Sequence, residues 1–179
     1  MKMIKNSILG FVLFFSGVGA LFAQNAFSQG EELFIRNKPQ EALAYLEAAA
    51  EEDPAHVKTA LYLAMAYEQL GRIEDALGVY RRILPQGAEE TARIAFNLGN
   101  ALFNSGDPAS AVSAYTQAVE ADPAYAPAYL NRANSLVKTG ALKEAVADYE
   151  LYLSLEPEAP QRLRIEELML FIREESPKE

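Results

Sequence analysis

Small and large apolar residues recur along the chain with a period of about 34 residues. Alanine opens each of four similar segments, at intervals of 34, 35 and 34 residues: Ala42, Ala76, Ala111 and Ala145. Four residues after each alanine comes a large apolar residue: Leu46, Tyr80, Tyr115 and Tyr149. Twelve residues before each alanine comes another small residue: Gly30, Ala64, Gly99 and Ala133. This pattern predicts two amphipathic helices per repeat, and the repeats must stack because none can bury its apolar face alone.

The small residues have a packing role in this interpretation. Glycine or alanine in the first helix and alanine in the second allow the two helix axes to approach closely, and the aromatic residue fills the space beside them. Glycine between the helices, as at Gly106, can adopt the left-handed conformation that ends a helix. Asp107 and Pro108 then read as the N-cap and first position of the next helix. The second repeat differs, because it has one extra residue and ends its second helix at Pro85 and Gly87.

The third repeat resembles the tetratricopeptide repeat family almost position by position. The resemblance is carried by the run from Asn97 to Leu102 and by Ala111, Tyr115, Ala118 and Pro123. It implies an all-α, right-handed solenoid of about four helix-turn-helix units. The units lie at residues 23–56, 57–91, 92–125 and 126–159, so that the repeat domain of the mature chain spans 24–159.

A last helix is expected at residues 160–175, followed by a tail at 176–179. One face, formed by Ile165, Leu168, Met169 and Ile172, should cap the end of the stack. Three apolar residues fall off that face: Leu163, Leu170 and Phe171. We favour their packing on the neighbouring second helix. The alternative is that they form a contact for a partner or for a second copy.

The first 23 residues have the layout of a secretory signal. Lys2 and Lys5 precede an uncharged run that ends on small residues at Ala23. Cleavage there would begin the mature chain at Gln24, and the protein would be periplasmic or secreted, with no membrane span left. The alternative is an uncleaved membrane anchor, which the shortness of the run and its three glycines disfavour.

Composition excludes several classes of function. The chain holds 25 acidic and 16 basic residues, a formal charge of −9, and loss of the signal makes this −11. Such a charge disfavours nucleic acid as a ligand. The absence of cysteine and the single histidine exclude thiolate and multi-histidine metal sites, so we expect neither metal nor cofactor.

No catalytic constellation is apparent, and we expect no enzyme. Ser135, Lys138, Thr139 and Gly140 spell two signatures of serine acyl-transfer enzymes, but those signatures belong on separate, converging elements. His56 follows an inter-repeat turn without a second base nearby, which is typical of a solvated residue. The acids of the second helices, Asp148 among them, are expected on a solvated convex face.

The family resemblance implies a groove, lined by first helices, that binds peptide or protein segments. Its expected residues are Tyr62, Met65, Arg93, Phe96, Asn97, Asn100, Phe103, Asn131, Asn134 and Lys138. Asn100 and Asn131 should face each other across its floor. An asparagine side chain donates and accepts hydrogen bonds, so it can pair with a peptide backbone without reading side chains.

The charge of this groove suggests its ligand. No acid occurs from Thr91 to Gly106 or from Pro123 to Lys143, whereas Arg93, Arg132 and Lys138 do. A neutral to mildly basic groove favours a partner with an acidic stretch or a C-terminal carboxylate. The sequence therefore predicts a non-enzymatic adaptor or scaffold of the cell envelope. The alternative is a structural subunit that assembles with a membrane complex, or with copies of itself, through the ends of the stack.

Overall fold

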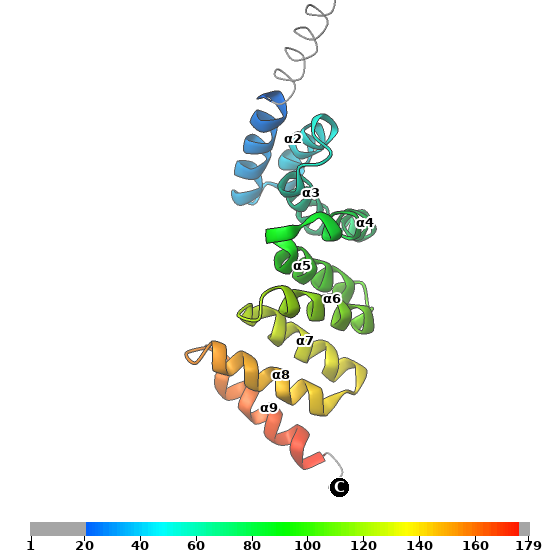
Figure 1. Cartoon of the computed structure of the whole chain (residues 1–179). Helices are drawn as coiled ribbons and strands as arrows, with labels where there is room; N and C mark the ends of the chain where they lie inside the picture. Colours follow the sequence, from blue (N-terminus) through cyan, green and yellow to red (C-terminus); the bar gives the residue numbers. More distant parts are fainter. Residues whose placement is uncertain (1–20, 176–179) are drawn as a thin grey trace, which may run out of the picture. The chain divides into compact units, whose positions relative to one another are not determined.

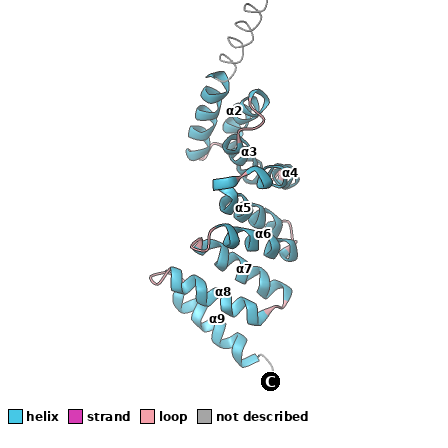
Figure 2. Ribbon diagram, viewed as in Figure 1, coloured by secondary structure: helices cyan, strands magenta, loops and turns pink. Residues whose placement is uncertain are grey.

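The computed structural model describes residues 21–175, and helices joined by short turns make up this part of the chain (Figures 1 and 2). Most of the expected signal segment and the tail at 176–179 lie outside the described residues. Residues 21–35 are helical and are followed by α2 (Pro39–Glu52), α3 (Val57–Gln69), α4 (Ile73–Ile83), η1 (Leu84–Gln86), η2 (Ala88–Glu90), α5 (Thr91–Asn104), α6 (Pro108–Ala121), α7 (Ala126–Thr139), α8 (Leu142–Leu155) and α9 (Arg162–Glu175). Within this region no helix combines the length and the apolar character that crossing a membrane requires.

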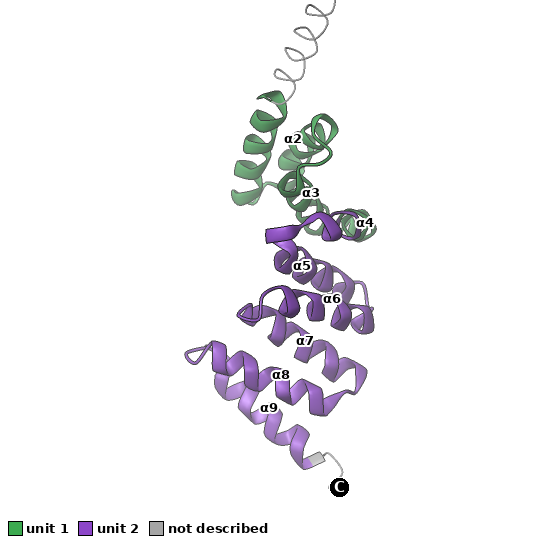
Figure 3. Cartoon of the chain, viewed as in Figure 1, with its two compact units in different colours: residues 1–79 green, residues 80–179 purple. Residues whose placement is uncertain are grey.

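The chain forms two compact units that divide inside α4, after Val79 (Figure 3). The described part of the first unit contains the helical segment 21–35, α2, α3 and the start of α4. The second unit contains the end of α4, the two short 3-10 turns and α5 to α9. The fold class is thus all-α with helical repeats, as the sequence predicts.

The first unit is held together by aliphatic residues of α2 and α3. Its core consists of Ala42, Leu43, Leu46, Leu63 and Ala66, and aromatic residues including Phe27, Phe34 and Tyr62 pack against it. Gly30 has the close approach that the repeat pattern predicts. A methyl group added to it would lie 2.7 Å from Cγ of Leu46, which is closer than side chains tolerate.

The second unit packs small residues against tyrosines. Alanines such as Ala118, Ala133 and Ala145 are fully buried, and the ring of Tyr149 is buried in the same cluster. At Gly99 an added methyl group would lie 2.5 Å from Cε1 of Tyr115. The prediction that a small residue permits close helix approach beside a tyrosine is confirmed here.

The turns between paired helices use left-handed residues. Gly71, Gly106 and Gly140 have φ values of 74°, 90° and 83°, as predicted, and Asn37 takes this role in the first pair with φ 58°. Asparagine is one of the few residues with a side chain that tolerates this conformation. Asp107 accepts a hydrogen bond of 3.0 Å from the backbone N–H of Ser110, which confirms it as an N-cap.

The outer residues of α9 differ from the favoured prediction. Ile165, Met169 and Ile172 are buried, but Leu168 is 36% exposed. Leu163, Leu170 and Phe171 do not rest on a neighbouring helix and are 75%, 57% and 61% exposed. The physical reason is that α8 covers one side of α9, and no described element follows to cover the other.

Candidate functional site

The expected binding residues lie on the first helices of three repeats. Tyr62 and Met65 are on α3, in the first compact unit. The other eight belong to the second unit. Arg93, Phe96, Asn97, Asn100 and Phe103 are on α5, and Asn131, Asn134 and Lys138 are on α7. Two of the ten expected residues thus belong to the first unit and eight to the second.

Asn100 and Asn131 meet between α5 and α7. The Nδ2 atom of Asn131 donates to Oδ1 of Asn100 at 2.8 Å, and the hydroxyl of Tyr115 donates to the same oxygen at 2.8 Å. Both contacts meet on the same side-chain oxygen of Asn100 and hold its amide in one orientation. We call Asn100 and Asn131 the asparagine pair.

The asparagine pair keeps hydrogen-bonding capacity for a ligand. Both side chains are partly exposed. Within the described residues, Nδ2 of Asn100 has no acceptor and Oδ1 of Asn131 has no donor. One free donor group and one free acceptor are what a peptide backbone requires, because each peptide unit presents one C=O and one N–H.

A second asparagine is held in the same way. The hydroxyl of Tyr149, on α8, donates to Oδ1 of Asn134 at 2.7 Å. Asn134 is exposed, and its amide nitrogen makes no hydrogen bond within the described residues. Burial raises the pKa of Tyr149 above its usual value, which keeps this hydroxyl protonated as a donor.

Aromatic rings form the side of the surface nearest the start of α5. The ring centroid of Phe96 lies 5.2 Å from that of Tyr125 in an edge-to-face arrangement and 5.9 Å from that of Tyr115. Burial raises the pKa of Tyr125, and the nearby positive charge of Arg93 opposes that rise. Asn97 and Phe103 are partly exposed on the same helix.

Two expected cations differ in how available they are. Nε of Arg93 lies 3.0 Å from Oε2 of Glu90, but its N–H makes no hydrogen bond because the two groups are poorly aligned. Lys138 is exposed at the end of α7 and forms no ion pair within the described part of the chain. Lys138 is thus the freer of the two charges.

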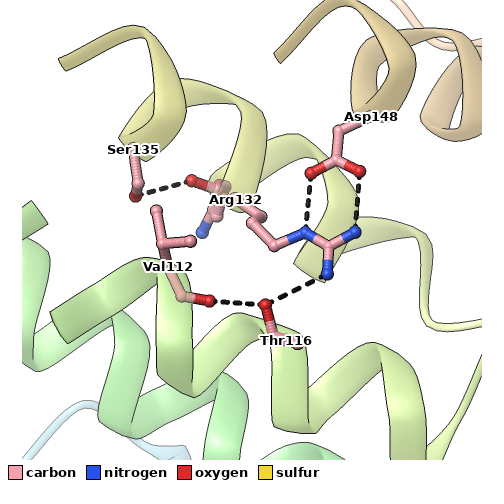
Figure 4. Close-up of polar contacts among 6 residues, drawn as sticks. Val112, Thr116, Arg132, Ser135 and Asp148 are labelled. Atoms are coloured by element: carbon pink, nitrogen blue, oxygen red, sulfur yellow. Dashed lines mark hydrogen bonds and ion pairs between the residues drawn. The ribbon is translucent and has the colours of Figure 1, made fainter. Parts of the chain in front are cut away.

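Arg132 does not contribute a free charge to this surface. Its guanidinium donates two hydrogen bonds of 2.7 Å to the carboxylate of Asp148 and one of 3.2 Å to Thr116 Oγ1 (Figure 4). Hydrogen bonding to Asp148 raises the pKa of Arg132. Asp148 is only 4% exposed, so its expected place on a solvated face is wrong. The ion pair joins α7 and α8, the hydrogen bond to Thr116 adds α6, and this cluster has a structural role.

The first unit has a smaller site around α3. Tyr62 makes edge-to-face contacts with Phe27 and Phe34, at centroid distances of 5.8 and 5.5 Å, and Met65 is partly exposed nearby on α3. A cavity of about 470 Å³ lies beside Phe27, Lys58 and His56. His56 is exposed as expected, but Nδ1 of its ring lies 2.6 Å from the hydroxyl of Thr59, so the side chain is held in place.

Several of these partners are absent from the sequence prediction, which assigns Tyr115 and Tyr149 to packing alone and Asp148 to the surface. A signal for them exists, because both tyrosines follow their asparagines by 15 residues and Asp148 follows Arg132 by 16. These offsets link the two antiparallel helices of one repeat.

Comparison with known proteins identifies the family. Two models of the tetratricopeptide repeat match residues 33–96 and 96–161, which together span most of the chain. The chain belongs to the tetratricopeptide repeat family. A curated relative, Protein FlbA of Caulobacter vibrioides, is 30% identical over 135 residues. That match covers 75% of this chain but only 22% of FlbA.

Solved structures show the same fold. A crystal structure of MamA has a TM-score of 0.76 at 21% identity and covers 86% of this chain and 81% of MamA. MamA from Desulfovibrio magneticus gives 0.74 at 20% identity, with coverage of 85% and 84%. A tetratricopeptide repeat protein from Parabacteroides merdae gives 0.75 at 15% identity, with coverage of 86% and 61%. At these identities the likeness concerns the tetratricopeptide fold alone.

Proposed function

We propose that this tetratricopeptide repeat protein is a non-enzymatic adaptor or scaffold that binds an extended segment of a partner protein across α5 and α7. The observation that carries the proposal is the asparagine pair. Its shared carbonyl oxygen is saturated by two donors, which leaves Nδ2 of Asn100 and Oδ1 of Asn131 for a ligand. A ligand backbone can satisfy both groups at once.

The surface is prepared before the ligand arrives. Tyr115 and Asn131 hold the Asn100 amide in one orientation, and Phe96 is held between two aromatic rings. A receptor whose side chains are already ordered loses less conformational entropy on binding. The ligand then bears most of the ordering cost.

The charge of the surface favours a ligand with an acidic stretch or a C-terminal carboxylate. Lys138 supplies the free cation, and Arg93 is only loosely paired with Glu90. Arg132 adds no free positive charge to the surface, because its guanidinium is paired with Asp148. Lys138 adds an attraction that acts at long range and weakens with salt.

The partner is an envelope protein in this proposal. The support is the sequence alone: Lys2 and Lys5 precede an apolar run that ends at Ala23, as in exported proteins. Export would place the binding surface in the periplasm or outside the cell.

The proposal is tested with an immobilised library of peptides of random sequence that end either in a free carboxylate or in an amide. Peptides with a free carboxylate should be among those that bind the wild-type chain. Asn131→Ala should weaken the affinity for these peptides by about tenfold. Asn131 is the better position to change because Asn100→Ala would also strip Tyr115 of its acceptor and lower stability.

The matched control is Asn104→Ala, which removes an exposed amide from the last residue of the same α5 helix. It should leave binding unchanged, and thermal melts should place both variants close to wild type. Lys138→Gln should weaken binding mainly at low salt. Equal binding by the wild type and Asn131→Ala chains would end the proposal, and a lack of preference for the free carboxylate would remove its ligand class.

A further inference from the structure

The exposed side of α9 carries an unusual set of residues. Leu163, Leu170 and Phe171 are more than half exposed, and Glu167 and Glu174 are exposed beside them. We call these five residues the outer α9 face. This face is distinct from the proposed peptide surface, because none of its five residues lies on α5 or α7.

Helix geometry places the five residues together. Each residue advances about 100° around an α-helix, so steps of four, three and four residues stay on one side. Leu163, Glu167, Leu170 and Glu174 therefore form one line along the helix, with Phe171 next to it. The opposite side carries the buried residues Ile165, Met169 and Ile172.

This face leaves large apolar side chains in contact with water in the described part of the chain. Here three large side chains with Leu168 expose on the order of 400 Å² of apolar surface, which is in the range of the largest apolar patch on a typical monomer, a patch that is often functional. A partner that covers only this patch would bury about 800 Å² in total, which is the size of a weak, transient interface.

The charges of the face indicate which partner fits. Of the three arginines of α9, Arg162 pairs with Glu166 and Arg173 pairs with Glu150 of α8, which leaves the single charge of Arg164 against two acids. Glu167 and Glu174 form no ion pair within the described residues. Their carboxylates lie between and beside the apolar side chains, where a covering partner would strip them of water.

A second copy of the chain fits this face poorly. A self-paired face would bring four carboxylates together, two from each copy. Each copy would contribute two carboxylates but only one unpaired cation, the exposed Arg164, which lies one turn from Leu168. A helix with lysine or arginine beside an apolar stripe supplies one cation per carboxylate and avoids the repulsion.

We propose that the outer α9 face is the docking site for a cationic amphipathic helix of a partner protein. The leucines and Phe171 bind the apolar stripe of that helix, and Glu167 and Glu174 pair with the cations along its edges. This second site would let the protein hold two segments, one on α9 and one on the α5 and α7 surface.

The experiment uses the purified full chain and a fluorescent synthetic helix of about 18 residues, with leucines on one stripe and lysines beside it. A matched peptide carries glutamates in place of the lysines. In anisotropy titrations the lysine peptide should bind at least about tenfold more tightly than the glutamate peptide. The double variant Leu170→Ser with Phe171→Ser should weaken the lysine peptide by about tenfold.

Controls separate this site from general charge attraction. Ile35→Ser removes a side chain that is 71% exposed in the other compact unit and should change binding by less than about twofold. Glu167→Gln with Glu174→Gln should weaken binding several-fold at about 50 mM salt and much less at about 300 mM salt. Asn131→Ala should have no effect, so a failure of the peptide surface and a failure of this site are distinguishable.

Several results would overturn the proposal. Equal binding of the lysine and glutamate peptides would do so, as would equal loss in Ile35→Ser and in the α9 double variant. Light scattering that shows a dimer abolished by the α9 double variant would assign the face to a second copy. Association with vesicles of neutral lipid that depends on Leu170 and Phe171 would assign it to a membrane.

Discussion

Tyrosine hydroxyls on α6 and α8 each donate to an asparagine that lies 15 residues earlier on the first helix of the same repeat. The ring fills the space beside a small residue, while the hydroxyl orients a side chain that we propose to bind peptide. Packing and binding are thus carried by the same residue. A single substitution at Tyr115 or Tyr149 would therefore affect both packing and binding.

Arg132 and Asp148 form the main buried ion pair described in the second unit. Asp148→Ala should lower the free energy of unfolding by about 3 kcal/mol, because it leaves the guanidinium without its partner. Urea unfolding measures this. Glu144→Ala, which changes an exposed acid on the same helix, should stay within about 0.5 kcal/mol of wild type. A double replacement of Arg132 by Met and Asp148 by Leu should recover most of the loss. Failure of Asp148→Ala to destabilise the chain would show that Arg132 turns out to water.

The pKa of Tyr149 predicts how stability depends on alkaline pH. Its pKa in the folded chain is raised by burial, so the folded state keeps a proton that the unfolded state releases above about pH 10. Its contribution is complete below that pH and is lost as the pH rises through the folded pKa. Tyr149→Phe should therefore show a shallower fall in melting temperature between about pH 10 and 11 than wild type, with exposed Tyr45→Phe as control. Parallel curves for wild type and Tyr149→Phe would contradict this expectation.

Helix pairs in this chain depend on where a side chain is absent. Gly99 and Gly30 lie so close to Tyr115 and Leu46 that even a methyl group would clash, whereas a methyl group at Gly78, on α4, would meet no atom within 4 Å. Glycine is therefore required at Gly99 and Gly30. At Gly78 it only lowers the helix propensity of α4.

This contrast gives a paired test. Gly99→Leu should lower the free energy of unfolding by about 1–3 kcal/mol or more, because the buried Tyr115 ring has no room to move. Gly78→Ala should raise it by about 0.5–1 kcal/mol through better helix propensity. Thermal melts of the two variants suffice. Similar shifts in both would mean that the helix crossing at Gly99 is looser than the structure shows.

Periodicity predicts the helices and their buried sides because it records which residues face a neighbour. The left-handed turns and the N-cap at Asp107 are predictable for the same local reason. Periodicity does not record which neighbour is present. The burial of Leu163, Leu170 and Phe171 is a wrong prediction, because no described element covers that side of α9, and the solvated place of Asp148 is wrong because Arg132 of the preceding helix binds it. The meeting of Asn100 with Asn131 is predictable because first helices of successive repeats are adjacent in this family.

The whole chain divides within α4, and each unit has a core of its own. Family membership and the all-α repeat fold could be predicted from the four similar segments. The identity of the partner could not, because tetratricopeptide surfaces differ by a few exposed side chains on a constant scaffold. Export likewise stays a prediction, since residues 1–20 lie outside the described structure.

Export has a direct test at the scale of the whole protein. Mass spectrometry of the native protein should show an N-terminus at Gln24, because Ala23 is the small residue that closes the apolar run. Replacing Lys2 and Lys5 by glutamate should leave the full-length chain inside the cell. An intact Met1 on the wild-type protein in the membrane fraction would support the anchored alternative instead.

The carbonyl oxygen of Asn100 also has a consequence for how the array unfolds. It accepts one hydrogen bond from its own repeat, through Tyr115, and one from the following repeat, through Asn131. Repeats in such arrays can come apart one by one from the ends, and the free energy between neighbours decides whether they do. A polar contact shared between α5, α6 and α7 adds to that free energy. Native-state hydrogen exchange should therefore show these three helices opening as one cooperative block, while α9, whose main contact is with α8, opens first.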